Sequence, residues 1–74
     1  MGKTSIRNNI RRLRFEANEM TQAELAEKVG VTRQTLNAIE TAKYSPTLDL
    51  AFRIARVFGV PLEEVFQYVG GPED

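Results

Sequence analysis

Apolar positions recur three and four residues apart along most of the chain, which is the spacing of amphipathic helices. Ile10, Leu13 and Ala17 share one face of a first helix, and Asn8 or Asn9 is its expected N-cap. Four further stretches repeat the pattern, each bordered by residues typical of helix ends. We therefore expect an all-α fold with five helices, over residues 10–17, 22–29, 33–41, 48–58 and 61–66.

The second and third helices carry the clearest local signals. Thr21 and Glu24 have the spacing of a capping box. Gly30 stands where a left-handed residue ends a helix, and Thr32 is the next N-cap candidate. Only three residues separate the two helices, so we expect the steep packing of a helix-turn-helix. The apolar residues expected to rest on the other helices are Leu25, Val29, Val31, Leu36 and Ile39.

The fourth helix is expected to begin after Thr47 and to end at Gly59, and its apolar stripe is interpreted as packing. Pro61 suits the first turn of the short fifth helix. At the other end of the chain, Ile6 either extends the face of the first helix or lies on an extended segment before it. The stripe of the fourth helix consists of Leu48, Ala51, Ile54, Ala55 and Phe58.

The composition limits the possible functions. The chain has 74 residues, so residues 1–74 are expected to form a single domain. Its core is expected to cover about residues 8–66, and the tail, residues 70–74, is expected to fray. It has no cysteine and no histidine, no glycine-rich phosphate loop and no carboxylate cluster with metal-ligand spacing. We therefore exclude an enzyme and expect no metal, cofactor or small-molecule ligand. No apolar run approaches the roughly 18 residues of a membrane span, so a cytoplasmic protein without a membrane is expected.

The ten basic and ten acidic residues cancel, but they are unevenly placed. Five basic residues and no acidic ones lie in the first fourteen positions, so the domain could show a basic face. The alternative is that these are ordinary solvated stretches. The five residues are Lys3, Arg7, Arg11, Arg12 and Arg14.

The stretch TQAELAEKVGVTRQTLNAIETAKYSPTLDLAFRIARVFGV resembles the Cro/repressor-type helix-turn-helix family, whose members are also called xenobiotic-response-element-like regulators. The resemblance covers roughly residues 8–66 and is specific from Thr21 to Pro46. It implies a five-helix lambda-repressor-like fold that binds double-stranded DNA. The segment from Phe15 to Met20 is one residue longer than the commonest family pattern, which leaves the end of the first helix undetermined.

The resemblance implies that the third helix reads bases. The chemistry of its residues fits that role, since Arg33 suits guanine and Gln34 suits adenine. A solvated helix would more often carry Glu and Lys pairs. The expected base-reading residues are Arg33, Gln34, Thr35, Asn37 and Ala38. Those expected at DNA phosphates are Gln22, Thr32, Lys43, Tyr44 and Ser45, with a hydrophobic plug as the alternative role of Tyr44.

The resemblance also implies a partly buried ion pair between Arg14 and Glu40, the alternative being an exposed Glu40. It further implies a short antiparallel pairing of residues 4–7 with residues 66–69, and a homodimer. Two copies would read a palindromic operator with half-sites roughly 34 Å apart. The expected interface residues are Leu62, Val65, Phe66 and Tyr68.

Two functions from different classes remain. The first is a homodimeric transcriptional repressor that binds a palindromic operator. The second is a protein-interaction module, such as an antitoxin or an adaptor subunit, built on the same fold. An interaction module has no need of Arg33, Gln34 and Asn37 together, so these three side chains favour the repressor.

Overall fold

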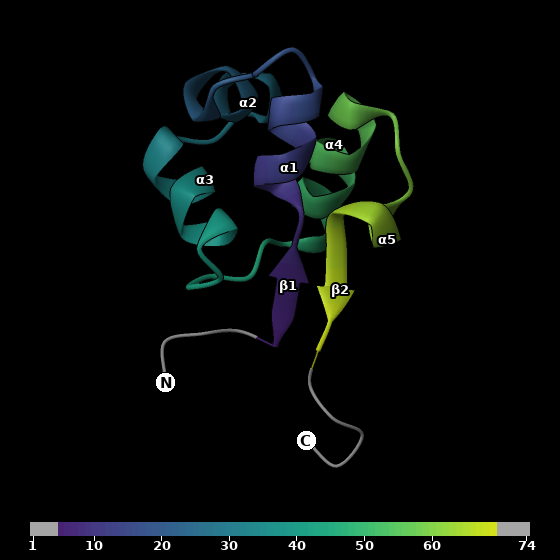
Figure 1. Ribbon diagram of the computed structural model, residues 1–74. Helices are drawn as coiled ribbons and strands as arrows, with labels where there is room; N and C mark the ends of the chain where they lie inside the picture. The colour runs from purple at the N-terminus through teal and green to yellow at the C-terminus, as the bar shows by residue number, and fades with distance from the viewer. Residues whose placement is uncertain (1–4, 70–74) are drawn as a thin grey trace.

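The computed structural model describes residues 5–69, and within them five helices surround one core (Figure 1). Residues 1–4 and 70–74 lie outside this range, and with them the expected fraying of the tail and the contribution of Lys3 and Thr4. The five-helix fold with a small terminal sheet is as predicted. The elements are β1 (Ile6–Asn8), α1 (Ile10–Glu16), α2 (Gln22–Val29), α3 (Arg33–Glu40), α4 (Leu48–Phe58), α5 (Leu62–Val65) and β2 (Phe66–Tyr68).

The helix borders follow the local signals of the sequence. The Thr21 hydroxyl accepts from the Glu24 N–H at 3.0 Å, and the Glu24 carboxylate accepts from the Thr21 N–H at 2.8 Å, which completes the capping box. Thr32 and Thr47 each accept from the backbone N–H three residues on. Pro61 differs from the expectation, since it is the N-cap of α5 and not part of its first turn.

The first helix begins and ends in ways that the sequence left open. Asn9 occupies the N-cap position, but the Asn8 side chain accepts from the Ile10 N–H at 3.0 Å. After Glu16 the chain turns through Asn18 and Glu19, which both have left-handed backbones, with φ of 62° and 57°. These two residues accommodate the long segment between the first two helices.

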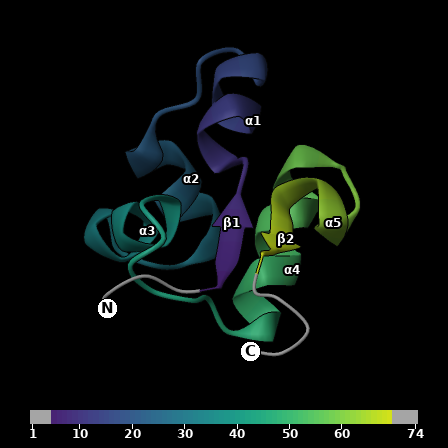
Figure 2. The same ribbon diagram turned by 60° about the horizontal axis from the view of Figure 1, so that its bottom comes forward.

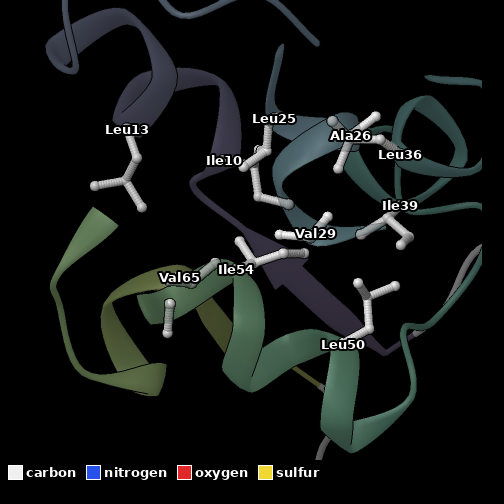
Figure 3. Packing of buried hydrophobic residues seen from close by; sticks show 11 residues of the cluster. Ile10, Leu13, Leu25, Ala26, Val29, Leu36, Ile39, Leu50, Ile54 and Val65 are labelled. Atoms are coloured by element: carbon white, nitrogen blue, oxygen red, sulfur yellow. The ribbon is translucent and has the colours of Figure 1, made fainter. Parts of the chain in front are cut away.

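The core gathers side chains from all five helices (Figure 3). Leu50 is buried in it, whereas Leu48 is 68% exposed, so the predicted stripe of α4 is wrong at its first residue. The side chain of Leu48 borders an open hollow instead of a packed neighbour. Val65 is 0% exposed, so its assignment to a dimer interface is wrong: the short α5 uses this side chain to close the core. The cluster consists of Ile10, Leu13, Leu25, Ala26, Val29, Leu36, Ile39, Leu50, Ile54, Ala55 and Val65.

The two ends of the described chain meet in an antiparallel ribbon of β1 and β2, which lie side by side in Figures 1 and 2. Ile6 pairs with Tyr68 and Asn8 with Phe66, and the Val69 N–H donates to the Ser5 carbonyl at 2.8 Å. The antiparallel pairing is as predicted, but the first strand covers Ile6–Asn8 where residues 4–7 were expected. Ile6 therefore lies on an extended segment and does not continue the face of α1.

Three helices end in a left-handed residue followed by a hydrogen bond that spans six residues. In α2 and α4 this residue is glycine, but after α3 it is Ala42, with φ of 62°. The Lys43 N–H donates to the Ala38 carbonyl and the Ala42 N–H to the Ile39 carbonyl, which defines a Schellman motif. Ala42 thus holds a conformation that costs an L-residue about 1–2 kcal/mol.

Replacing Ala42 with glycine is expected to stabilise the protein by about 0.5 kcal/mol, because the relieved strain exceeds the extra chain entropy that glycine loses. The reverse change, Gly59→Ala, is the matched control. An added Cβ there meets no atom within 4 Å, so the cost of about 1 kcal/mol is that of the backbone alone. Urea unfolding measures both. A less stable Ala42→Gly variant contradicts the assignment of strain.

Candidate nucleic-acid interface

The third helix lies at the margin of the molecule, on the side away from α5 (Figures 1 and 2). Leu36 and Ile39 face the core with 0% and 1% exposure. Arg33, Gln34 and Asn37 are exposed on the other side. We call these three residues the reading edge. The structure therefore leaves bare the polar side chains from which the sequence predicted base contacts.

Beside the reading edge, Thr35 and Ala38 are half-buried and help to line a hollow of about 320 Å³. Gln34 and Tyr44 complete its lining. Tyr44 is 51% exposed, so its ring is neither a core plug nor fully solvated. Lys43 and Ser45 are exposed in the same loop after α3, where they remain candidates for phosphate contact.

The Gln22 side chain is half-buried and makes three hydrogen bonds to other side chains of the protein. Its Nε2 donates to Asn37 Oδ1 and to Glu40 Oε1, both at 3.1 Å, and its Oε1 accepts from Arg33 Nη1 at 3.3 Å. An amide has two donor hydrogens, and both are used here. A phosphate at the start of α2 would therefore meet the backbone N–H groups of Gln22 and Ala23, because the Glu24 N–H already donates to the Thr21 hydroxyl. Sequence spacing could not reveal these bonds, because they join Gln22 of α2 to residues of α3.

A buried ion pair joins α1 to the end of α3. Arg14 Nε donates to Glu40 Oε2 at 2.6 Å and Arg14 Nη2 to Glu40 Oε1 at 3.1 Å. Arg14 Nη1 donates to the Met20 carbonyl at 2.8 Å, in the turn before α2. The two side chains are 15% and 7% exposed, so Glu40 is not the solvated residue of the alternative interpretation.

Asn8 provides a second link to α3. Its Nδ2 donates to the carbonyls of Ile39 and Glu40 at 2.9 and 3.3 Å. These carbonyls are in the last turn of α3, where regular helical bonds end, and the Ile39 carbonyl also accepts from the Ala42 N–H. The ribbon thus caps the helix that carries the reading edge. Sequence spacing could not reveal this contact, because Asn8 and Glu40 are 32 residues apart.

Among the described basic residues of the first fourteen positions, two are paired with acidic side chains. Arg14 is neutralised by Glu40, and Arg12 lies 3.4 Å from Glu16 and 4.0 Å from Glu64. Arg7 and Arg11 are exposed. Thr32, expected at a phosphate, uses its hydroxyl to cap α3, accepting from the Thr35 N–H.

Within residues 5–69, no three or more metal-binding side chains gather in a group that could hold an ion. None of the helices in that part of the chain has the length and apolar character needed to cross a bilayer.

Comparisons with known proteins agree with this geometry. A family model described as helix-turn-helix matches residues 10–65. An uncharacterised HTH-type transcriptional regulator of Methanocaldococcus jannaschii is 55% identical over 51 residues, which cover 69% of this chain and 77% of the relative. One from Methanothermobacter thermautotrophicus is 53% identical over 62 residues, covering 82% and 88%.

Two more distant similarities extend the comparison. The cryptic phage CTXphi transcriptional repressor RstR of Vibrio cholerae is 36% identical over 58 residues, covering 78% of this chain and about half of the relative, 51%. A crystal structure from Bacteroides fragilis superposes with a TM-score of 0.74 at 24% identity, covering 84% and 98%, which shows the fold alone. The chain belongs to the Cro/C1-type helix-turn-helix family and is a DNA-binding transcriptional regulator, not an enzyme.

Removing one partner of the buried ion pair is expected to destabilise the protein strongly. Arg14→Ala leaves a buried carboxylate uncompensated, which should cost about 3 kcal/mol. Arg12→Ala is the matched control, because Arg12 and Glu16 form a pair that is about half exposed, 52% and 56%. That change should cost no more than about 0.5 kcal/mol. Urea unfolding of both variants tests this, and equal losses contradict a special role for the buried pair.

Proposed function

We propose that this protein is a homodimeric repressor that binds a palindromic operator through α3. The observation that carries the proposal is the exposed reading edge, Arg33, Gln34 and Asn37, on a helix whose opposite face is buried. Side chains of this kind match the donor and acceptor atoms of base edges in the major groove. Repression is supported by the name of the Vibrio cholerae relative. The protein binds its operator DNA in the cytoplasm.

Each part of the interface has a distinct role in this proposal. Arg33, Gln34 and Asn37 contact base edges, and Thr35 and Ala38 add apolar contact at the hollow beside them. The start of α2 and the exposed loop from Lys43 to Ser45 bind phosphates. Phosphate contacts position the protein, whereas base contacts select the sequence.

The homodimer is proposed to form around an apolar groove of about 360 Å³. Leu48 and Phe52 lie one turn apart on α4 and are 68% and 50% exposed, and Tyr68 is 63% exposed at the end of β2. A second copy is the occupant we favour, because the groove adjoins the loop that follows α3. Pairing there brings two reading edges onto one DNA. The lining residues are Ile6, Ser45, Pro46, Leu48, Ala51, Leu62 and Phe66.

Selection of bound fragments from the genome of the source organism tests the function. The protein is expected to enrich a small set of fragments that share a palindrome, with half-sites about one helical turn, roughly 34 Å, apart. Gel shifts at two salt concentrations then separate specific from non-specific binding. Equal binding to every fragment, or none, contradicts the proposal and favours an interaction module.

Two single substitutions separate base reading from phosphate binding. Arg33→Ala is expected to relax the preference at one base position in each half-site, because about 1–3 kcal/mol of discrimination is lost. Lys43→Ala should weaken binding to all sequences alike and reduce the salt slope by about 1 per subunit. Competition binding over a salt series measures both. If the two variants behave identically, this division of roles is wrong.

Placing a charge in the groove is expected to break the dimer. Leu48→Asp should raise the dimer dissociation constant at least about a hundredfold, because burying an unpaired carboxylate costs several kcal/mol. Phe15→Asp is the matched control, since Phe15 is equally exposed, 69% against 68%, and does not line the groove. Sedimentation velocity compares the two. A dimeric Leu48→Asp variant shows that the interface lies elsewhere.

A further inference from the structure

A continuous chain of side-chain hydrogen bonds runs from the buried ion pair to the reading edge. It passes from Arg14 to Glu40, from Glu40 to Gln22, and from Gln22 to both Arg33 and Asn37. Its inner end is nearly buried, whereas Arg33 and Asn37 are exposed. The base-reading side chains are therefore attached to a charged group inside the protein.

The inner end of this chain is fixed. Both oxygens of Glu40 accept hydrogen bonds from Arg14, and Oε1 is shared with Gln22 Nε2. Arg14 is held in turn by the Met20 carbonyl. Glu40 therefore presents a charged acceptor to Gln22 in one position. A carboxylate offers no hydrogen, so only the NH₂ end of the Gln22 amide can face it.

This requirement sets the direction of the next two bonds. With its NH₂ facing inward, Gln22 uses its second hydrogen on Asn37 Oδ1 and offers its Oε1 to Arg33 Nη1. The Asn37 amide is thereby oriented with Oδ1 toward Gln22, which uses one of the two lone pairs of that oxygen, and its NH₂ group remains for a partner outside. Arg33 keeps its other N–H groups and has no acceptor.

We propose that Glu40 sets the polarity of the reading edge: through Gln22 it turns the Asn37 oxygen inward and presents Arg33 and the Asn37 NH₂ group to DNA as hydrogen-bond donors, which selects acceptor-rich base edges such as guanine. Glu40 is a positioning residue and touches no base. Guanine presents two acceptors, O6 and N7, in the major groove, whereas adenine recognition by an asparagine needs both its amide oxygen and its NH₂ group. Asn37 therefore disfavours adenine. This inference rests on the proposed function of α3.

The proposal is tested by measuring the base preference of the protein at each position of a randomised half-site. The position at which Asn37→Ala loses its preference is the one that Asn37 contacts. The wild-type protein is expected to prefer guanine over adenine there, because guanine presents two acceptors, O6 and N7, whereas adenine presents one acceptor, N7, beside the N6 donor. Gln22→Ala frees the Asn37 oxygen and leaves the Arg14–Glu40 pair intact. It should reduce the preference for guanine over adenine at that position by at least about fivefold.

Glu40→Gln should change the base preference at the same position relative to the wild-type protein. The two proteins are compared under conditions in which circular dichroism shows that the variant is folded. Glu27→Gln is the matched control, because Glu27 is exposed on α2 and its side chain makes no hydrogen bond or ion pair within residues 5–69. It should leave the preference unchanged. Loss of stability alone would weaken binding to all sequences equally, so a changed preference is a signature of positioning.

Two results overturn the proposal. One is a wild-type protein that prefers adenine at the Asn37 position. The other is a folded Gln22→Ala variant with unchanged base preference and weaker binding to all sequences alike, which assigns Gln22 to a phosphate. Either result leaves the proposed function standing. If the wild-type protein selects no sequence at all, the proposed function fails as well.

Discussion

The contact between the Arg14 guanidinium and the Glu40 carboxylate is the constraint on which the proposed DNA-binding face depends. It joins the first helix to the last residue of α3, and Arg14 also holds the turn before α2. A buried pair is stable only when its remaining donors and acceptors are satisfied. That condition is met here, since no buried side-chain polar atom within residues 5–69 lacks a hydrogen-bond partner.

The third helix is held in place from three directions. Leu36 and Ile39 pack into the core, Asn8 of the ribbon caps the last turn, and Gln22 of α2 holds the exposed side. A side chain that is ordered before binding loses less entropy when it meets its partner. The scaffold therefore supports both the position of α3 and the orientation of the side chains on its outer edge.

Features that act over a few residues were predicted from residue chemistry, whereas the long-range Arg14–Glu40 pair and the terminal strand pairing were anticipated only through the family resemblance. The caps at Thr21, Gly30 and Thr32 were predicted, because cap chemistry acts over three or four residues. The burial of Val65 and the exposure of Leu48 were not, because they depend on which elements lie opposite. The exposed reading edge was anticipated from residue types, but its internal hydrogen bonds were not. They require α2 and α3 to lie at their actual distance.

The central claim, that DNA meets the outer edge of α3 while the buried pair stays in place, is tested most directly by NMR. The measurement is a titration of ¹⁵N-labelled protein with a selected DNA fragment, followed through side-chain N–H signals. The account predicts that the signals of Arg33, Gln34 and Asn37 move and that the Nε–H signal of Arg14 stays. It is contradicted if the Arg33 and Asn37 signals are unchanged while those around Lys28, on α2, move.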